Sequence, residues 1–146
     1  MARLFFDTSA LVERYYEEEE SEVVDGLVES GDEVVITSLS VVETASGLRR
    51  KQNRGELTAD EVDRLLSAFF DEALDEFVIL PMDESLSGTA LDLVLKDDLR
   101  TLDSLQLAAG LSLATGTEDP TFVRADRDLV NVAADRGLET RNPESD

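Results

Sequence analysis

Short apolar runs without polar alternation are the feature of this sequence that most restricts its fold. They occur at residues 4–6, 34–36, 77–80 and 122–123. Strands that are covered on both faces have this pattern, whereas a strand with one face in water alternates apolar and polar residues. A weaker run at residues 138–140 is a candidate for a last strand. We therefore expect a sheet that is buried on both sides.

Segments with helical periodicity separate these runs. They lie at about residues 9–16, 20–29, 40–52, 58–75, 84–95, 101–115 and 127–136. Strands that alternate with helices indicate parallel pairing through right-handed crossovers. We predict an α/β chain folded as a three-layer α/β/α sandwich around a mainly parallel sheet of four to five strands. A single domain is expected over residues 1–141, with a flexible C-terminal tail at 142–146.

The composition excludes several kinds of site. The chain contains neither His nor Cys, so it cannot form a Ser–His–Asp triad, a thiol nucleophile or a zinc site built from those residues. Catalysis would depend on carboxylates, hydroxyls, Arg or Lys, together with a hard cation such as Mg²⁺ or Mn²⁺. No apolar segment is long enough for a secretory signal or a membrane span, so we expect a cytoplasmic protein without membrane partners.

The net charge requires its own explanation. The 146 residues include 34 acidic and 13 basic side chains, for a formal charge of −21. Such an excess of acid repels phosphate backbones and, taken alone, argues against a nucleic-acid partner. However, the acids are spread along the whole chain, which is typical of proteins from a salt-loaded cytoplasm where ions screen self-repulsion. We interpret the charge as that of a halophilic protein; the alternative is a function that uses the acid.

Four acids stand where a parallel sheet gathers its working groups, beyond the strand ends or in the first turn of a predicted helix. They are Asp7, Glu43, Asp103 and Asp126. Each also fits a structural role: Ser40 and Glu43 match a capping box, and Asp103 complements a helix dipole. Thr58 and Glu61 show the same box where no site is expected. A single acid therefore decides nothing, whereas the set of four is informative.

The segments around these acids resemble the PIN-domain ribonucleases, particularly the VapC-type toxins of prokaryotic toxin–antitoxin pairs. The similar segments are residues 6–12, 37–43, 99–109 and 122–129. Their order, spacing and flanking apolar residues agree with the family over about residues 3–140. There is one departure, because Arg124 stands where the family usually has Thr or Ser two residues before the last acid.

The resemblance implies a metal-dependent endoribonuclease that hydrolyses RNA phosphodiester bonds. Asp7, Glu43, Asp103 and Asp126 would bind one or two Mg²⁺ or Mn²⁺ ions and so form the catalytic centre. The chemistry fits, because clustered carboxylates need a divalent cation to stay ionised together and the cation lowers the pKa of a bound water. The resemblance also implies a small VapB-like antitoxin as partner, and a homodimer.

Further residues near the acids are candidates for supporting roles. Four polar side chains could orient the metal ligands, although each also fits an ordinary helix start: Thr8, Ser9, Ser104 and Asp128. Arg14 and Arg50 are candidates for RNA contacts. Arg50 shares one helix face with Glu43, seven residues earlier, but it could equally complement the C-terminus of its own helix.

Two alternatives stay open at this point, and two other acid-based classes do not fit the residues. Arg124 is compatible with a PIN-like module that has lost catalysis and acts through protein partners, and a housekeeping RNA-processing nuclease has the same motifs. An aspartyl-phosphate phosphatase would need an acid where Ser9 stands. A calcium loop beginning at Asp126 would need Gly where Asn131 stands.

Overall fold

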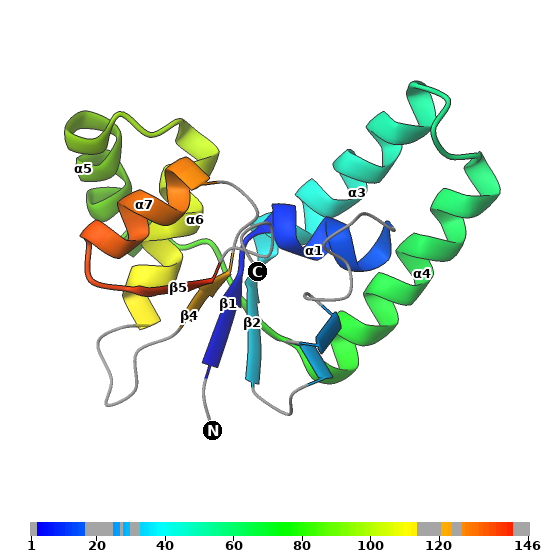
Figure 1. The fold of residues 1–146 in the computed structure, drawn as a ribbon, viewed down its shortest axis with the longest axis horizontal. Helices are drawn as coiled ribbons and strands as arrows, with labels where there is room; N and C mark the ends of the chain where they lie inside the picture. Colours follow the sequence, from blue (N-terminus) through cyan, green and yellow to red (C-terminus); the bar gives the residue numbers. More distant parts are fainter. Residues whose placement is uncertain are drawn as a thin grey trace.

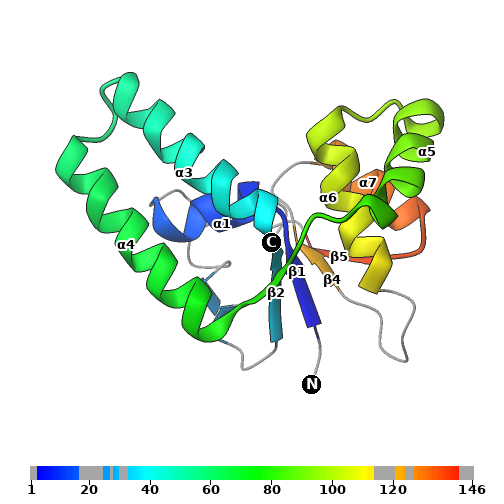
Figure 2. The ribbon, with the colours of Figure 1, turned by 180° about the vertical axis from the view of Figure 1, so that it is seen from behind.

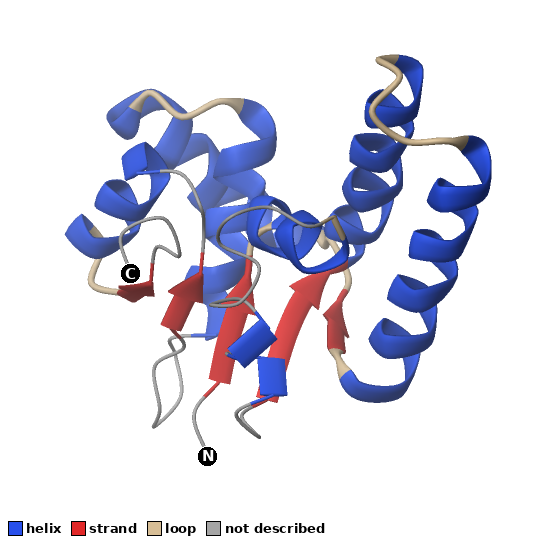
Figure 3. Cartoon of the chain, turned by 45° about the vertical axis from the view of Figure 1, so that its right-hand side comes forward, coloured by secondary structure: helices blue, strands red, loops and turns tan. Residues whose placement is uncertain are grey.

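The strands form one parallel sheet, as the apolar runs predict. A computed structural model describes residues 3–16, 25–26, 28–29, 33–113, 121–123 and 127–141, without the side chains of 13, 127 and 128. Within this part the sheet has five strands in the order β3-β2-β1-β4-β5. Their bounds are β1 Arg3–Phe6, β2 Glu33–Thr37, β3 Val78–Leu80, β4 Thr121–Val123 and β5 Glu139–Arg141. Every neighbouring pair is parallel (Figure 3), which confirms the predicted architecture.

Helices cover both faces of the sheet. The described helices are α1 Thr8–Tyr15, α3 Ser38–Asn53, α4 Ala59–Glu76, the short 3₁₀ helix η1 Glu84–Leu86, α5 Ser87–Asp97, α6 Thr101–Ser112 and α7 Arg127–Asp135. The α3 and α4 helices lie side by side and extend away from the sheet, opposite the group of α5, α6 and α7 (Figures 1 and 2). None of the described helices is long and apolar enough to cross a membrane.

Alternate side chains of each strand pack into two separate cores. Phe5 and Phe122 point to the face covered by α5, α6 and α7, whereas Leu4, Phe6 and Val123 point to the face covered by α1 and α4. Burial of both faces explains why these runs show no polar alternation. Each fully buried Phe contributes about 1.5–3 kcal/mol by the area that it removes from water.

The start of α3 differs from the prediction. Thr37, at the end of β2, is the N-cap of this helix, and its hydroxyl accepts a hydrogen bond from the backbone N–H of Ser40. The predicted capping box of Ser40 and Glu43 is therefore wrong. The reason is that Thr37 is itself a good capping residue and stands three positions earlier. Glu43 consequently lies in the second turn of α3 and not in the first.

Most other element boundaries agree with the prediction within two residues, but α6 ends three residues earlier than expected and the segment predicted at 84–95 divides into η1 and α5. The predicted box of Thr58 and Glu61 is confirmed at the start of α4. Phe77 ends α4 and precedes β3, so it does not begin the strand. The predicted last strand exists one residue later, as β5. The helix expected at 20–29 falls largely outside the described residues, and the tail at 142–146 falls there entirely.

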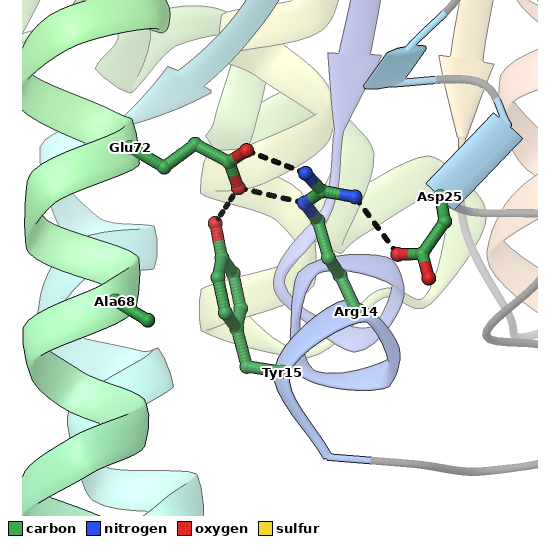
Figure 4. A pocket seen from close by; sticks show the side chains of 5 residues that line it. All are labelled: Arg14, Tyr15, Asp25, Ala68 and Glu72. Atoms are coloured by element: carbon green, nitrogen blue, oxygen red, sulfur yellow. Dashed lines mark hydrogen bonds and ion pairs between the residues drawn. The ribbon is translucent and has the colours of Figure 1, made fainter.

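A half-buried charged cluster ties α1 to α4 (Figure 4). The Nε of Arg14 donates to Glu72 over 2.6 Å, and its Nη1 donates to Asp25 over 2.8 Å. The Tyr15 hydroxyl also donates to Glu72. Burial by itself would raise the pKa of Glu72, but the hydrogen bonds from Arg14 and Tyr15 outweigh it and lower this pKa below its ordinary value.

This lowered pKa predicts how stability depends on pH. A carboxyl whose pKa is lower in the folded chain stabilises the fold above its unfolded pKa of 4.5, and this contribution is lost as the pH falls. We expect Glu72→Gln to lower the free energy of unfolding by about 1–3 kcal/mol at pH 7. The difference from wild type should shrink below pH 4, as measured by chemical denaturation. Glu76→Gln, an exposed acid on the same helix, is the control, and an equal deficit at both pH values would contradict the prediction.

Thr44 provides a second test of the packing. It is fully buried in α3, and its Oγ1 finds no hydrogen-bond partner in the described part of the chain. A buried hydroxyl without a partner costs stability, and Val has almost the same shape. Thr44→Val should therefore raise the free energy of unfolding by about 1 kcal/mol. Ser40→Ala, which removes a buried hydroxyl that is bonded, should lower it; a loss of stability in Thr44→Val would show that the hydroxyl is satisfied.

Candidate active site

The first predicted site residue lies at the carboxyl end of the central strand. Asp7 directly follows β1 and is the N-cap of α1, with only 2% of its surface exposed. Its Oδ2 accepts hydrogen bonds from the backbone N–H of Ser9 over 3.2 Å and from the Ser9 hydroxyl over 3.1 Å. The backbone N–H of Asp7 donates to Val123 of β4 over 3.0 Å. Asp7 is thus a helix cap, and Ser9 holds its carboxylate in place through two hydrogen bonds, which fits both roles considered for Ser9.

Glu43 reaches from the second turn of α3 to the start of α1. Its Oε1 accepts a hydrogen bond from Thr8 Oγ1 over 2.9 Å and from Gln106 Nε2 over 3.2 Å. The residue next to Asp7 therefore contacts the second predicted acid, which brings Asp7 and Glu43 to the same edge of the sheet. Among the described residues, Glu43 has no cation as an ion-pair partner, so its charge is oriented but not neutralised.

Gln106 is the centre of a buried polar network at this edge. It lies in α6 and is 1% exposed. Its Oε1 accepts from Thr37 Oγ1 over 2.9 Å, and its Nε2 lies 2.6 Å from Ser40 Oγ and 3.0 Å from Thr8 Oγ1. The network joins the end of β2 with α1, α3 and α6. Asp7 precedes α1, Glu43 lies in α3 and Asp103 lies in α6.

A cavity brings Glu43 and Asp103 together. It has a volume of about 440 Å³ and is lined by Glu43, Arg100, Thr101, Leu102 and Asp103. Asp103 lies in the first turn of α6, as predicted. The Arg100 side chain is exposed, and no described residue pairs with its guanidinium. The cavity therefore combines two carboxylates with one cation.

The remaining predicted residues are only partly placed. Ser104 is buried, but its hydroxyl donates to the Thr101 carbonyl of its own helix over 2.7 Å, so it does not reach an acid. Asp126, Arg124 and the side chain of Asp128 lie outside the described residues. Within the described part of the chain, no three acidic side chains are close enough together to hold a metal ion by themselves.

The two arginines proposed for RNA contacts have different surroundings. Arg14 is held by Glu72 and Asp25, and its side chain is only 15% exposed. Because its guanidinium is engaged within the fold, Arg14 does not fit a role in contacting RNA. Arg50 is exposed on α3, and its Nη1 donates to Ser46 one turn earlier over 2.8 Å. It remains a candidate for contacting a substrate.

Two residues at the site were not identified from the sequence. Gln106 is the one polar residue in the apolar stretch 105–109, and a lone amide in such a stretch indicates buried hydrogen bonds. Arg100 stands three positions before Asp103, a spacing that places two residues on the same side of a helix start. Both signals were present, but neither indicates its partners.

The donor chemistry fits a hard divalent cation. The described side chains that face the cavity offer carboxylate and hydroxyl oxygens, which are among the ligands that Mg²⁺ and Mn²⁺ prefer. Glu43 and Asp103 share the cavity, and Asp7 is linked to Glu43 through Thr8. A cation at this edge would supply the charge that Glu43 lacks among its hydrogen-bond partners.

Solved structures with the same fold share little sequence with this chain. FitAcB from Neisseria gonorrhoeae is 18% identical, with a TM-score of 0.71 over 97% of this chain and 98% of that one. VapC20 from Mycobacterium tuberculosis, described as a toxin that cleaves the sarcin-ricin loop, is 15% identical, with a TM-score of 0.67 over 92% and 95%. A toxin-antitoxin complex from Klebsiella pneumoniae contains a chain that is 14% identical, with a TM-score of 0.66 over 96% and 97%. At these identities the likeness establishes the fold alone.

The sequence itself establishes the family. No curated protein matches it, but the model of the PIN domain matches residues 4–135. This match covers most of the chain and includes all four acids on which the resemblance was based. The chain therefore belongs to the PIN domain family.

Proposed function

We propose that this protein is a metal-dependent endoribonuclease and the toxin of a type II toxin–antitoxin pair. The observation that carries the proposal is the shared cavity of Glu43 and Asp103, with Asp7 linked to Glu43 through Thr8, in a chain of the PIN domain family. Two carboxylates beside an open space support a site that would take a metal ion and a phosphodiester.

The residues have distinct parts in the proposed reaction. Asp7, Glu43, Asp103 and Asp126 would hold one or two Mg²⁺ or Mn²⁺ ions. A bound cation of this kind makes a water more acidic and polarises the phosphate. Ser9 orients the carboxylate of Asp7 through two hydrogen bonds. Thr8 and Gln106 orient that of Glu43 in the same way.

RNA is the substrate that the comparisons support. The structurally similar VapC20 is described as cleaving the sarcin-ricin loop, and Arg100 gives the cavity a cation that would attract a phosphate. Arg50, further along α3, would contact the same RNA strand.

A small antitoxin and a second copy of this chain are the proposed protein partners. One structurally similar protein was solved as a toxin-antitoxin complex. Large apolar side chains on α3, α4 and α5 are exposed and available for such contacts: Val42, Leu74, Leu91 and Leu95.

Substitution of the acids tests the catalytic proposal. We expect Glu43→Gln and Asp103→Asn each to reduce Mn²⁺-dependent cleavage of a fluorescent single-stranded RNA by about 100-fold or more, because each removes a metal ligand. Circular dichroism should show an unchanged fold. Glu76→Gln, an exposed acid on α4, should cleave like wild type. Full activity of either purified variant would instead favour a PIN module that acts only through protein partners, and cleavage of DNA but not RNA would overturn the substrate class.

Salt dependence tests the role of Arg100. For single strands, each phosphate contact contributes about 0.7 to the slope of log affinity against log salt concentration. Arg100→Ala should therefore weaken RNA binding and reduce this slope by about 0.7. Binding is measured by fluorescence anisotropy in a Glu43→Gln background that prevents cleavage, over the salt range in which both proteins stay folded. Arg49→Ala removes the same charge from an exposed residue outside the cavity; an equal effect of the two variants would show that only net charge matters.

A further inference from the structure

The side chain of Gln106 is a polar amide that is buried in the protein and therefore needs hydrogen-bond partners there. It is 1% exposed, and a buried amide that lacks hydrogen-bond partners destabilises a fold. All of its groups are satisfied, by side chains from the end of β2 and from α1 and α3. These partners are between 63 and 98 residues away in the sequence. Such a residue specifies how separate elements meet.

The hydrogen bonds determine which way the amide points. Thr37 Oγ1 accepts from the backbone N–H of Ser40 as the cap of α3, and its own proton is then free to go to Gln106 Oε1. This directs the NH₂ group of Gln106 towards Ser40, Thr8 and Glu43. The opposite orientation would place Oε1 against the Glu43 carboxylate, and two acceptors repel each other.

The effect on Glu43 is orientation without neutralisation. Its Oε1 accepts hydrogen bonds from Thr8 Oγ1 and Gln106 Nε2, and both donors are neutral. Its Oε2 accepts no hydrogen bond from the described residues. An Arg or Lys in place of Gln106 would form an ion pair with Glu43 and compete with any cation, whereas an amide leaves the negative charge available.

We propose that Gln106 is a positioning residue, which fixes Oε1 of Glu43 so that Oε2 is available to a divalent cation in the cavity shared with Asp103. This inference rests on the proposed function, because it assumes that the cavity binds a metal. It adds that the metal affinity of the site depends on a buried amide that does not touch the cation.

Mn²⁺ binding by the intact protein, measured by isothermal titration calorimetry, separates this role from a merely structural one. Gln106→Met keeps the length of the side chain and removes its hydrogen bonds. We expect the Mn²⁺ affinity to fall about 10- to 100-fold, as for other residues that orient metal ligands. Gln106→Asn keeps a buried amide but is one methylene too short to bond both Thr37 and Glu43. It should lose Mn²⁺ affinity as well, and it serves if the Met variant does not fold.

The matched control breaks the same network without touching Glu43. The hydroxyl of Ser40 forms hydrogen bonds with Gln106, Thr8 and Thr37, and none with Glu43. Ser40→Ala should therefore lower stability but leave Mn²⁺ affinity nearly unchanged. Thr8→Val, which removes the other donor to Oε1, should lower Mn²⁺ affinity, and Thr8→Ser should restore it.

Two results would overturn different claims. If both Gln106 variants bind Mn²⁺ like wild type while Glu43→Gln and Asp103→Asn do not, Gln106 is structural only and the proposed nuclease stands. If Glu43→Gln and Asp103→Asn also bind Mn²⁺ like wild type, the proposed metal site itself is wrong, and the role of Gln106 with it.

Discussion

The hydrogen bonds of Gln106 are the interaction on which the rest of the site depends. A buried polar network is stable only when each member has its partners, so its elements can meet in few ways. Here the network joins the end of β2 with α1, α3 and α6. Thr8, the residue after Asp7, begins α1, whereas Glu43 lies in α3 and Asp103 in α6. One buried amide therefore joins the helices that carry three of the predicted ligands, and it bonds one of these ligands, Glu43, directly.

Several acidic residues of the described chain differ from Glu43 in the charge of their partners. Some are neutralised by arginine: Glu72 pairs with Arg14 and ties α1 to α4, and Asp92 and Asp97 pair with Arg136 and tie α5 to the end of α7. Glu43, in contrast, receives only neutral donors. In a chain with a net charge of −21, Glu43 thus differs from these paired acids, because none of its described hydrogen-bond donors carries a positive charge.

Local sequence patterns predicted the elements well and their exact caps less well. The apolar runs identified all five described strands, and the periodic segments identified the helices, because both patterns depend on burial and not on particular partners. The capping box failed at Ser40 and Glu43 although it succeeded at Thr58 and Glu61. The same pattern fits both places, but at the first one the preceding strand ends in another capping residue, Thr37.

Burial patterns were sufficient to predict a parallel α/β sheet, and the resemblance of the four acidic segments predicted the family. The placement of acids at strand ends indicated the edge of the sheet at which Asp7 and Glu43 lie. Partner choice depended on the tertiary structure. Arg14 has charge enough to bind a phosphate, but Glu72, 58 residues away, engages it. In the sequence, Gln106 is only a polar residue in an apolar stretch. Its partners Thr37, Thr8 and Glu43 are brought to it by the fold. Periodicity reports which side of an element is buried, whereas long-range hydrogen bonds exist only once separate elements have packed together.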